Sequence, residues 1–191
     1  MSWLAEVAHE ALRVLWLSAP VLVAAAVQIA AIKLDWLPGL KRPLDGGRSW
    51  RGVRLLGDNK TWRGLAIYAG VSTVAILPQG LWVRARGLEY FDYGHLPTLV
   101  AAGALLGLGF ALGELPNSFL KRRVGIAPGT RGNPAFVILD QVDSLIGCLV
   151  CLTPVWVAPP RVWAVTLVLC SGLHMLFNGV FVLLGLKKSV F

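Results

Sequence analysis

The sequence predicts an all-α, polytopic integral membrane protein with five transmembrane helices and two sizeable cytoplasmic loops. Of its 191 residues, 56% are hydrophobic and only 15% are charged. The mean hydropathy is +0.67, and the apolar residues form long blocks, whereas a soluble domain interleaves them with charged residues. Five blocks are long enough to cross a hydrocarbon core of about 30 Å, which needs roughly 20 helical residues. This length leaves room for one membrane-embedded domain, residues 1–191.

The expected spans have recognisable boundaries. Glu6 and Glu10 precede the first span, and because a cleavable signal peptide begins with basic residues, we expect none here. The second span starts after "GDNKTWRG", and the fourth opens with Asn133 as a helix cap and Pro134 in the first turn. The fifth ends at a pair of lysines. The five expected spans are residues 14–32, 65–83, 98–113, 135–157 and 162–186.

Glycines are concentrated in the third expected span, at Gly103, Gly107, Gly109 and Gly113. Small residues four apart let two helices approach closely, so the spacing favours helix packing. A glycine-lined substrate groove is the less favoured alternative.

Basic residues predict the orientation. Fourteen of the 18 Lys and Arg residues lie in loops 33–63 and 114–134 and at the C-terminus. We expect the protein to lie in the cell's inner membrane. The positive-inside rule places these basic segments in the cytoplasm and the N-terminus outside. The net charge of +8 then indicates orientation and contact with anionic membrane lipids, and no nucleic acid is expected as a partner.

The three cysteines lie inside apolar segments. Cys148 and Cys151 form a single CxxC motif with no second pair and no nearby histidine in the sequence. We therefore favour buried small hydrophobic residues over a zinc site.

Two carboxylates interrupt the fourth span, in "PAFVILDQVDSLIG". Asp140 and Asp143 are three residues apart and so share one helix face, about 8 and 12 Å from its cytoplasmic start. Glu114, at the end of the third span, is expected at the same depth. Converging carboxylates repel one another unless a cation joins them, and oxygen ligands favour Mg²⁺.

Spacing alone leaves a metal site and a proton path of a transporter equally open. Neighbouring basic residues favour the metal site, with a metal-bound polyphosphate as its ligand, over the proton path. The sequence "KRR" at 121–123 and the stretch "GDNKTWRG" would place cations at the rim of a pocket with acids at its floor.

Several motifs, in this order, resemble those of one family. "KTWRG" looks like a stretch of the phosphatidate cytidylyltransferases, and "GELPNSFLKRR" followed by "LDQVDSLIG" resembles their signature. The match is closer to their shorter relatives, the CDP-archaeol synthases (CTP:archaeol-phosphate cytidylyltransferases). It includes the closing "HMLFNGVFVLLGLK" and runs from about residue 38 to residue 188.

The resemblance implies phospholipid biosynthesis: transfer of CMP from CTP to a lipid phosphate of the inner leaflet, with Mg²⁺, giving a CDP-lipid and pyrophosphate. It implies catalytic roles for Asp140, Asp143 and Lys121, and a metal set of Asp140, Asp143 and Glu114. Substrate contacts would come from Asp58, Asn59, Lys60, Thr61, Arg63, Asn117, Ser118, Arg122 and Arg123. A phosphate monoester is largely dianionic near neutral pH, so no protein base is needed, and neither cytoplasmic loop contains histidine.

Some alternatives stay open. His174 and Asn178 share a helix face, where an interhelical hydrogen bond is favoured over a role in the site. Asp58 and Asn59 either cap the second helix or contact CTP. A small cation-coupled transporter is the alternative function, and a lipid-binding scaffold would leave Asp140 and Asp143 unexplained. The oligomeric state and the ether or ester linkage of the lipid are not predicted.

Overall fold

The computed structural model describes residues 3–128, 130 and 132–183. Within this part of the chain, five helices account for most residues: α1 (Trp3–Lys33), α2 (Trp62–Ala85), α3 (Leu96–Arg123), α4 (Pro134–Cys151) and α5 (Pro160–Leu183). Helices α1 to α4 have the length and composition of membrane spans, and α5 is apolar over residues 160–176. The all-α, polytopic architecture expected from the sequence is confirmed.

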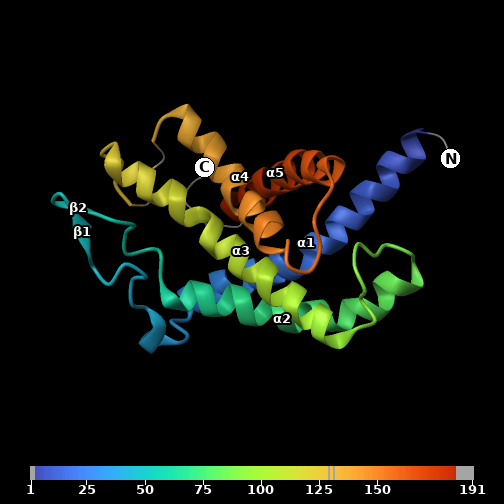
Figure 1. Cartoon of the computed structure of the whole chain (residues 1–191). Coiled ribbons are helices and arrows are strands. Elements are labelled where there is room, and N and C mark those ends of the chain that lie inside the picture. The colour runs from blue at the N-terminus through green and yellow to red at the C-terminus, as the bar shows by residue number, and fades with distance from the viewer. Residues whose placement is uncertain (1–2, 129, 131, 184–191) are drawn as a thin grey trace.

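Helix α3 lies at the centre of the bundle (Figure 1), where it packs against α2 on one side and α4 on the other and also contacts α1. The four glycines make this packing possible. A Cβ atom at Gly103 would lie 2.7 Å from the Cα of Thr73 in α2, and one at Gly109 would lie 2.7 Å from the Cα of Cys148 in α4. Since no side chain fits there, the prediction that these glycines serve helix packing is confirmed.

Several predicted boundaries were wrong. Helix α3 does not end at Gly113 but continues to Arg123, so Glu114 and the "KRR" sequence are helical and not in a loop. The predicted end was the last residue of the apolar run, just before the first charged residue. The helix itself continues, because its charged side chains have partners in other elements. Helix α1 starts at Trp3, well before the predicted span, and α4 stops at Cys151 instead of continuing to residue 157.

The helix caps were predicted in part. Asn133 caps α4 as expected, its side chain accepting a hydrogen bond from the backbone of Phe136 at 3.2 Å. The cap of α2 is Thr61, whose hydroxyl accepts from the backbone of Gly64, so the capping alternative for Asp58 and Asn59 was wrong.

Residues 34–61 form an ordered connection between α1 and α2. It contains a short 3₁₀ turn, η1 (Pro38–Leu40), and an antiparallel hairpin of β1 (Ser49–Trp50) and β2 (Val53–Arg54). Arg51 and Gly52 at the hairpin tip have φ values of 52° and 78°, as two-residue hairpin loops of the type I′ class require. The hairpin lies beside the C-terminal end of α3 (Figure 1).

The carboxylate of Asp45 holds this connection together. It accepts hydrogen bonds from the Arg54 guanidinium at 2.9 Å and from the backbone nitrogens of Gly47 and Leu56 at 3.0 Å each. Burial alone would raise the pKa of Asp45, but these hydrogen bonds outweigh it and hold the pKa below its ordinary value.

Candidate active site

Close packing of α3 on α4 brings the charged groups together. A Cβ atom at Gly113 would lie 3.1 Å from the Cα of Ser144, so the two backbones nearly touch at this level. The next turns of α3 carry Asn117 and Lys121, which face the acids of α4. The glycine contact therefore determines the geometry of the acidic site.

Asn117 bridges the two aspartates, and Lys121 pairs with one of them. The side-chain nitrogen of Asn117 donates to Asp140 Oδ1 at 2.7 Å and to Asp143 Oδ2 at 2.8 Å. The ammonium of Lys121 lies 2.6 and 2.5 Å from the two carboxylate oxygens of Asp140. Both Asn117 and Lys121 are buried. One carboxylate oxygen of each aspartate thus accepts from the same amide nitrogen.

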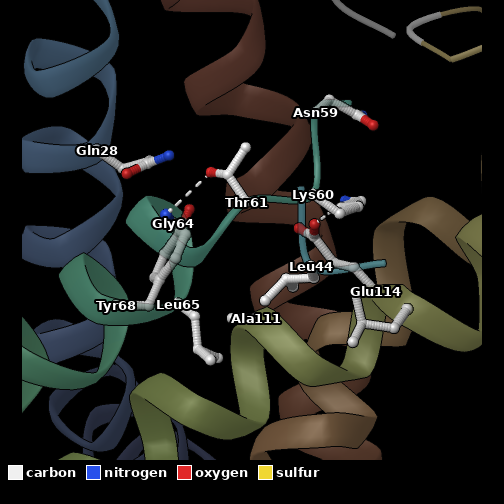
Figure 2. A pocket seen from close by; sticks show the side chains of 11 residues that line it. Gln28, Leu44, Asn59, Lys60, Thr61, Gly64, Leu65, Tyr68, Ala111 and Glu114 are labelled. Carbon is white, nitrogen blue, oxygen red and sulfur yellow. Dashed lines mark hydrogen bonds and ion pairs between the residues drawn. The ribbon is translucent and has the colours of Figure 1, made fainter. Parts of the chain in front are cut away.

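Glu114 joins the same network through a hydroxyl group. Ser144 Oγ donates to Glu114 Oε1 at 3.2 Å and lies 3.3 Å from Asp143 Oδ1. The other oxygen of Glu114 forms an ion pair with the ammonium of Lys60, which comes from the loop before α2 (Figure 2). Glu114 and Asp143 therefore lie on either side of the Ser144 hydroxyl. Across the described ranges, however, no three His, Cys, Asp or Glu side chains are close enough to hold one metal ion.

A pocket of about 140 Å³ lies beside the Lys60–Glu114 pair, between α1, α2, α3 and the loop that precedes α2. Figure 2 shows Gln28 reaching into it from α1 toward Thr61 and Gly64, while Lys60 and Glu114 face each other on the other side. Leucines, Tyr68 and Ala111 supply the apolar part of its lining. The pocket therefore extends the charged site toward α1.

Two of the predicted phosphate-binding arginines bind backbone oxygens in this structure. Arg122 donates to the carbonyl of Leu56 at 2.7 Å and also to that of Ile126. Arg123 donates to the carbonyls of Trp50 and Val53 at 2.9 and 3.0 Å. Both side chains fasten the 34–61 connection to the end of α3.

The remaining predicted residues lie around this centre. Arg63 is buried and donates to Asp35 Oδ1 at 3.1 Å, and hydrogen bonds from Lys41 and Arg63 hold the pKa of Asp35 below its ordinary value. Asp58 is 78% exposed and pairs with Arg54, which also binds Asp45. Ser118 is buried on α3.

The predicted pair on the fifth span is described only in part. His174 is half-buried on α5, whereas the side chain of Asn178 lies outside the described residues, as do Lys187 and Lys188. The three cysteines are free thiols. Two of them, Cys148 and Cys170, are buried, as expected of small hydrophobic residues.

Sequence reasoning did not single out Gln28 or Asp45. Gln28 is a polar side chain within the apolar stretch "AAAVQIAAI", and this interruption was the available signal. Asp45 lies next to a Gly-Gly pair in a loop rich in basic residues, and only the folded connection reveals its hydrogen bonds.

A bundle of apolar helices with acids and lysines paired at one end is the architecture of a multi-pass membrane protein with a polar site inside it. A solved structure of an intramembrane enzyme for archaeal membrane lipids biosynthesis matches the fold with a TM-score of 0.59 and 30% sequence identity, covering 85% of this chain and 90% of that one. The family model "CarS-like: CDP-archaeol synthase" matches residues 8–191. The chain belongs to the CDP-archaeol synthase family.

Individual relatives agree with this assignment. The CDP-archaeol synthase of Halorubrum lacusprofundi is 40% identical over 160 residues, covering 80% of this chain and 86% of the relative. That of Halobacterium salinarum is 38% identical over 161 residues, covering 80% and 85%. The chain is thus a membrane cytidylyltransferase that produces a CDP-lipid, and the transporter alternative finds no support.

Proposed function

We propose that this protein transfers the cytidylyl group of CTP to the phosphate of an archaeol-type lipid and releases pyrophosphate. A nonbridging oxygen of the lipid phosphate bonds to the α-phosphorus of CTP. The bond from that phosphorus to the oxygen bridging the β-phosphate breaks, and its electron pair leaves with pyrophosphate. The observation that carries the proposal is the network at the end of α3, in which Asn117 bridges Asp140 and Asp143 and Lys121 pairs with Asp140.

We assign Mg²⁺ to the two aspartates, and the donor set fits this ion. Asp140 and Asp143 each place one carboxylate oxygen within 2.8 Å of the side-chain nitrogen of Asn117. A cation bound beside this nitrogen would reach both oxygens. The side-chain oxygen of Asn117 is buried beside them without a hydrogen-bond partner in the described chain. Mg²⁺ is usually held by one or two carboxylates together with substrate phosphates and water, so Glu114 is not required as a direct ligand. The ion would neutralise charge on the phosphates as the bond to pyrophosphate breaks.

The lysines are the groups best placed to meet phosphate. Lys121 and Lys60 each pair with a carboxylate at the site, and an ammonium on a flexible stem can exchange that partner for a phosphate oxygen. Arg122 and Arg123 would act indirectly, because they hold in place the loop that carries Lys60. Catalysis then consists of positioning and charge neutralisation.

We further assign the site to the cytoplasmic face, with the N-terminus outside. The loop 34–61, the end of α3 and the start of α4 meet at one end of the bundle (Figure 1). This end carries most of the basic residues, which favours the cytoplasmic side. CTP would reach the site from water, while the lipid phosphate would enter from the inner leaflet.

The test is an assay of the purified protein in detergent with CTP labelled at the α-phosphate, Mg²⁺ and a panel of ether- and ester-linked lipid phosphates. We expect labelled CDP-lipid and an equal amount of pyrophosphate, with the ether-linked substrate preferred, and no product after chelation of the metal. Product formation that is unaffected by chelation would refute the metal assignment. Absence of CDP-lipid with every substrate would refute the proposed reaction.

A further inference from the structure

The turn that follows α1 exposes a cluster of apolar side chains. Each of them is between 39% and 62% exposed, and they lie outside the five α-helices, between the end of α1 and the hairpin. An exposed apolar patch that belongs to no membrane span marks an interaction surface. We call this cluster the apolar turn; it consists of Leu34, Trp36, Leu37 and Leu40.

The backbone of the apolar turn has an unusual conformation. Asp35 and Leu37 have φ values of 52° and 53°, in the left-handed region that residues with a side chain rarely adopt. Leu37 gains little burial from this conformation, since its side chain is half exposed. Backbone strain of this kind is concentrated at functional sites. The conformation therefore indicates a contact beyond the chain itself.

Hydrogen bonds hold the apolar turn against the first turn of α2. The buried guanidinium of Arg63 donates to Asp35 Oδ1 at 3.1 Å and to the backbone carbonyl of Trp36 at 3.2 Å. The backbone nitrogen of Trp62 donates to the carbonyl of Arg42 at 3.1 Å. The apolar turn is thus fixed in place and lies level with the start of α2.

The start of α2 lies at the edge of the membrane. This helix has 24 residues and the composition of a span, so it is about 36 Å long at 1.5 Å per residue. It exceeds a hydrocarbon core of about 30 Å by little more than one helical turn in all. Its first residue, Trp62, is exposed, as tryptophans at the boundary of a bilayer are. The apolar turn, beside the start of α2 in Figure 1, therefore lies at the level of the lipid headgroups.

Basic side chains surround the apolar turn. Lys33 ends α1, and Lys41 and Arg42 follow the turn; all three are exposed. The acid within the turn, Asp35, is neutralised by its ion pairs with Lys41 and Arg63. Apolar side chains flanked by cations are complementary to the boundary where lipid tails meet anionic phosphates. At headgroup level, lipid is the occupant that this combination fits.

We propose that the apolar turn is an interfacial anchor, which inserts its four apolar side chains between headgroups and tails and places Lys33 and Arg42 against lipid phosphates. The anchor goes beyond the proposed reaction and does not depend on it. It fixes the depth of the 34–61 connection, in which the backbone nitrogen of Leu44 donates to the carbonyl of Lys60 at 2.8 Å. The lysine that pairs with Glu114 is thereby held at a constant distance from the headgroups.

The experiment places a fluorescent probe in the turn and leaves the four apolar side chains intact. Gly39 has nothing within 4 Å of an added Cβ atom, so Gly39→Cys can carry a nitrobenzoxadiazole maleimide. Ser49→Cys is the reference, because the hairpin lies away from the start of α2 (Figure 1). The full-length protein is reconstituted in phosphatidylcholine vesicles, with or without the same lipid brominated high in its chains. Wild-type protein treated in the same way corrects for the native cysteines.

We expect the probe at position 39 to emit at shorter wavelength than the probe at position 49, and to lose much more of its emission to the brominated lipid. Adding Trp36→Ser and Leu37→Ser should return the emission at position 39 toward that at position 49 and reduce the quenching. Val53→Ser is the matched control, since Val53 is an exposed apolar residue of the hairpin. It should leave wavelength and quenching unchanged.

A second arm tests the cations. Phosphatidylglycerol brominated at the same position should quench the probe at position 39 more strongly than brominated phosphatidylcholine at low salt. The difference should shrink as salt is raised, because ions screen the attraction between exposed charges. Lys33→Gln combined with Arg42→Gln should remove it. Equal quenching by the two lipids at low salt would contradict the contact of these cations with lipid phosphates.

Equal quenching at positions 39 and 49 would overturn the proposal. Short-wavelength emission that brominated lipid does not quench would assign the apolar turn to a protein contact, such as a second copy of the chain, and would overturn it as well. The comparison of the two positions needs neither serine substitution, so it decides the question even if those variants do not fold. Because no arm measures synthesis of CDP-lipid, failure of the proposed reaction would be a separate result.

Discussion

At the scale of single residues, the charged groups of the site have partners on other elements of the fold. Lys121 pairs with Asp140 and Lys60 with Glu114, while Asn117 joins the two aspartates. Each side chain that is proposed to bind a metal or a phosphate thus has a protein partner that a ligand would replace. Substitutions at these positions should affect turnover more than folding.

Asp143→Asn tests the metal assignment. We expect turnover to fall at least about 100-fold, because one of two anionic ligands is lost, and to recover little at high Mg²⁺. The protein should remain folded, since Asn117 still pairs with Asp140 at 2.7 Å. Product formation measures the first effect and elution of a single species in detergent the second. Near wild-type turnover would be incompatible with a metal at this position.

Lys121→Ala tests the phosphate role. Without the ammonium, we expect a higher KM for CTP and a kcat/KM lower by about 100-fold, because a charge-assisted contact to phosphate is lost. Asp140 is 39% exposed, so water can solvate it and the fold should persist. Lys121→Arg is the control that preserves charge and should retain part of the activity. An unchanged KM for CTP would count against the role.

At the scale of elements, α3 combines two tasks along its length. Its glycine-rich half fits against α2 and α4, and its polar end supplies Asn117, Lys121, Arg122 and Arg123 to the site and to the neighbouring loop. The position of the polar end depends on the glycine contacts that precede it.

Gly109→Ala tests this dependence. The added methyl group would lie 2.7 Å from the Cα of Cys148, so the backbones must separate. We expect a loss of about 1–3 kcal/mol in stability, typical of overpacking, together with lower turnover. Thermal unfolding and the product assay measure the two effects. Gly172→Ala, whose methyl group would meet nothing within 4 Å, is the control and should lower neither quantity.

Acid should detach the 34–61 connection through Asp45. Because its pKa is lowered in the folded protein, Asp45 stabilises the fold at pH values above its unfolded pKa of about 4. That contribution is lost as the pH falls through the lower, folded value. Limited proteolysis at decreasing pH should therefore show cleavage of this loop in the wild type only below about pH 4. Asp45→Asn should be cleaved already at neutral pH, and equal resistance of the two proteins there would contradict the prediction.

The sequence predicted elements better than the contacts between them. Apolar runs indicated every helix, and Asn133 followed by Pro134 located the start of α4. The predicted end of α3 was wrong because the hydropathy of the sequence falls at the first charged residue. The helix continues past that residue, and its Asn117 and Lys121 side chains pair with α4. The partners of Arg122 and Arg123 could not be predicted, since backbone carbonyls leave no signal in a sequence.

At the scale of the whole molecule, the site lies at one end of the bundle and its basic loops lie with it. The hairpin, the end of α3 and the start of α4 are gathered there, while residues 86–95 connect α2 and α3 at the opposite end (Figure 1). The proposed orientation puts the first end in the cytoplasm.

Cysteine labelling tests this orientation. Arg48 and Arg86 are both exposed, and they lie at opposite ends of the bundle. In intact cells, a membrane-impermeant maleimide should label Arg86→Cys, whereas Arg48→Cys should react only after permeabilisation. The protein with its native cysteines alone gives the background. The reverse pattern would place the site outside the cell.

The charge pairs of the site also bear on how a highly charged substrate is received at the edge of an apolar bilayer. When CTP and its cation arrive, the ammonium of Lys121 or Lys60 can exchange its carboxylate for a phosphate oxygen, and the carboxylate that it leaves can receive the incoming ion. Binding then includes an exchange of counter-ions between the protein and the substrate. Neither member of these pairs has to stand alone in an apolar surrounding, where an unpaired charge is costly.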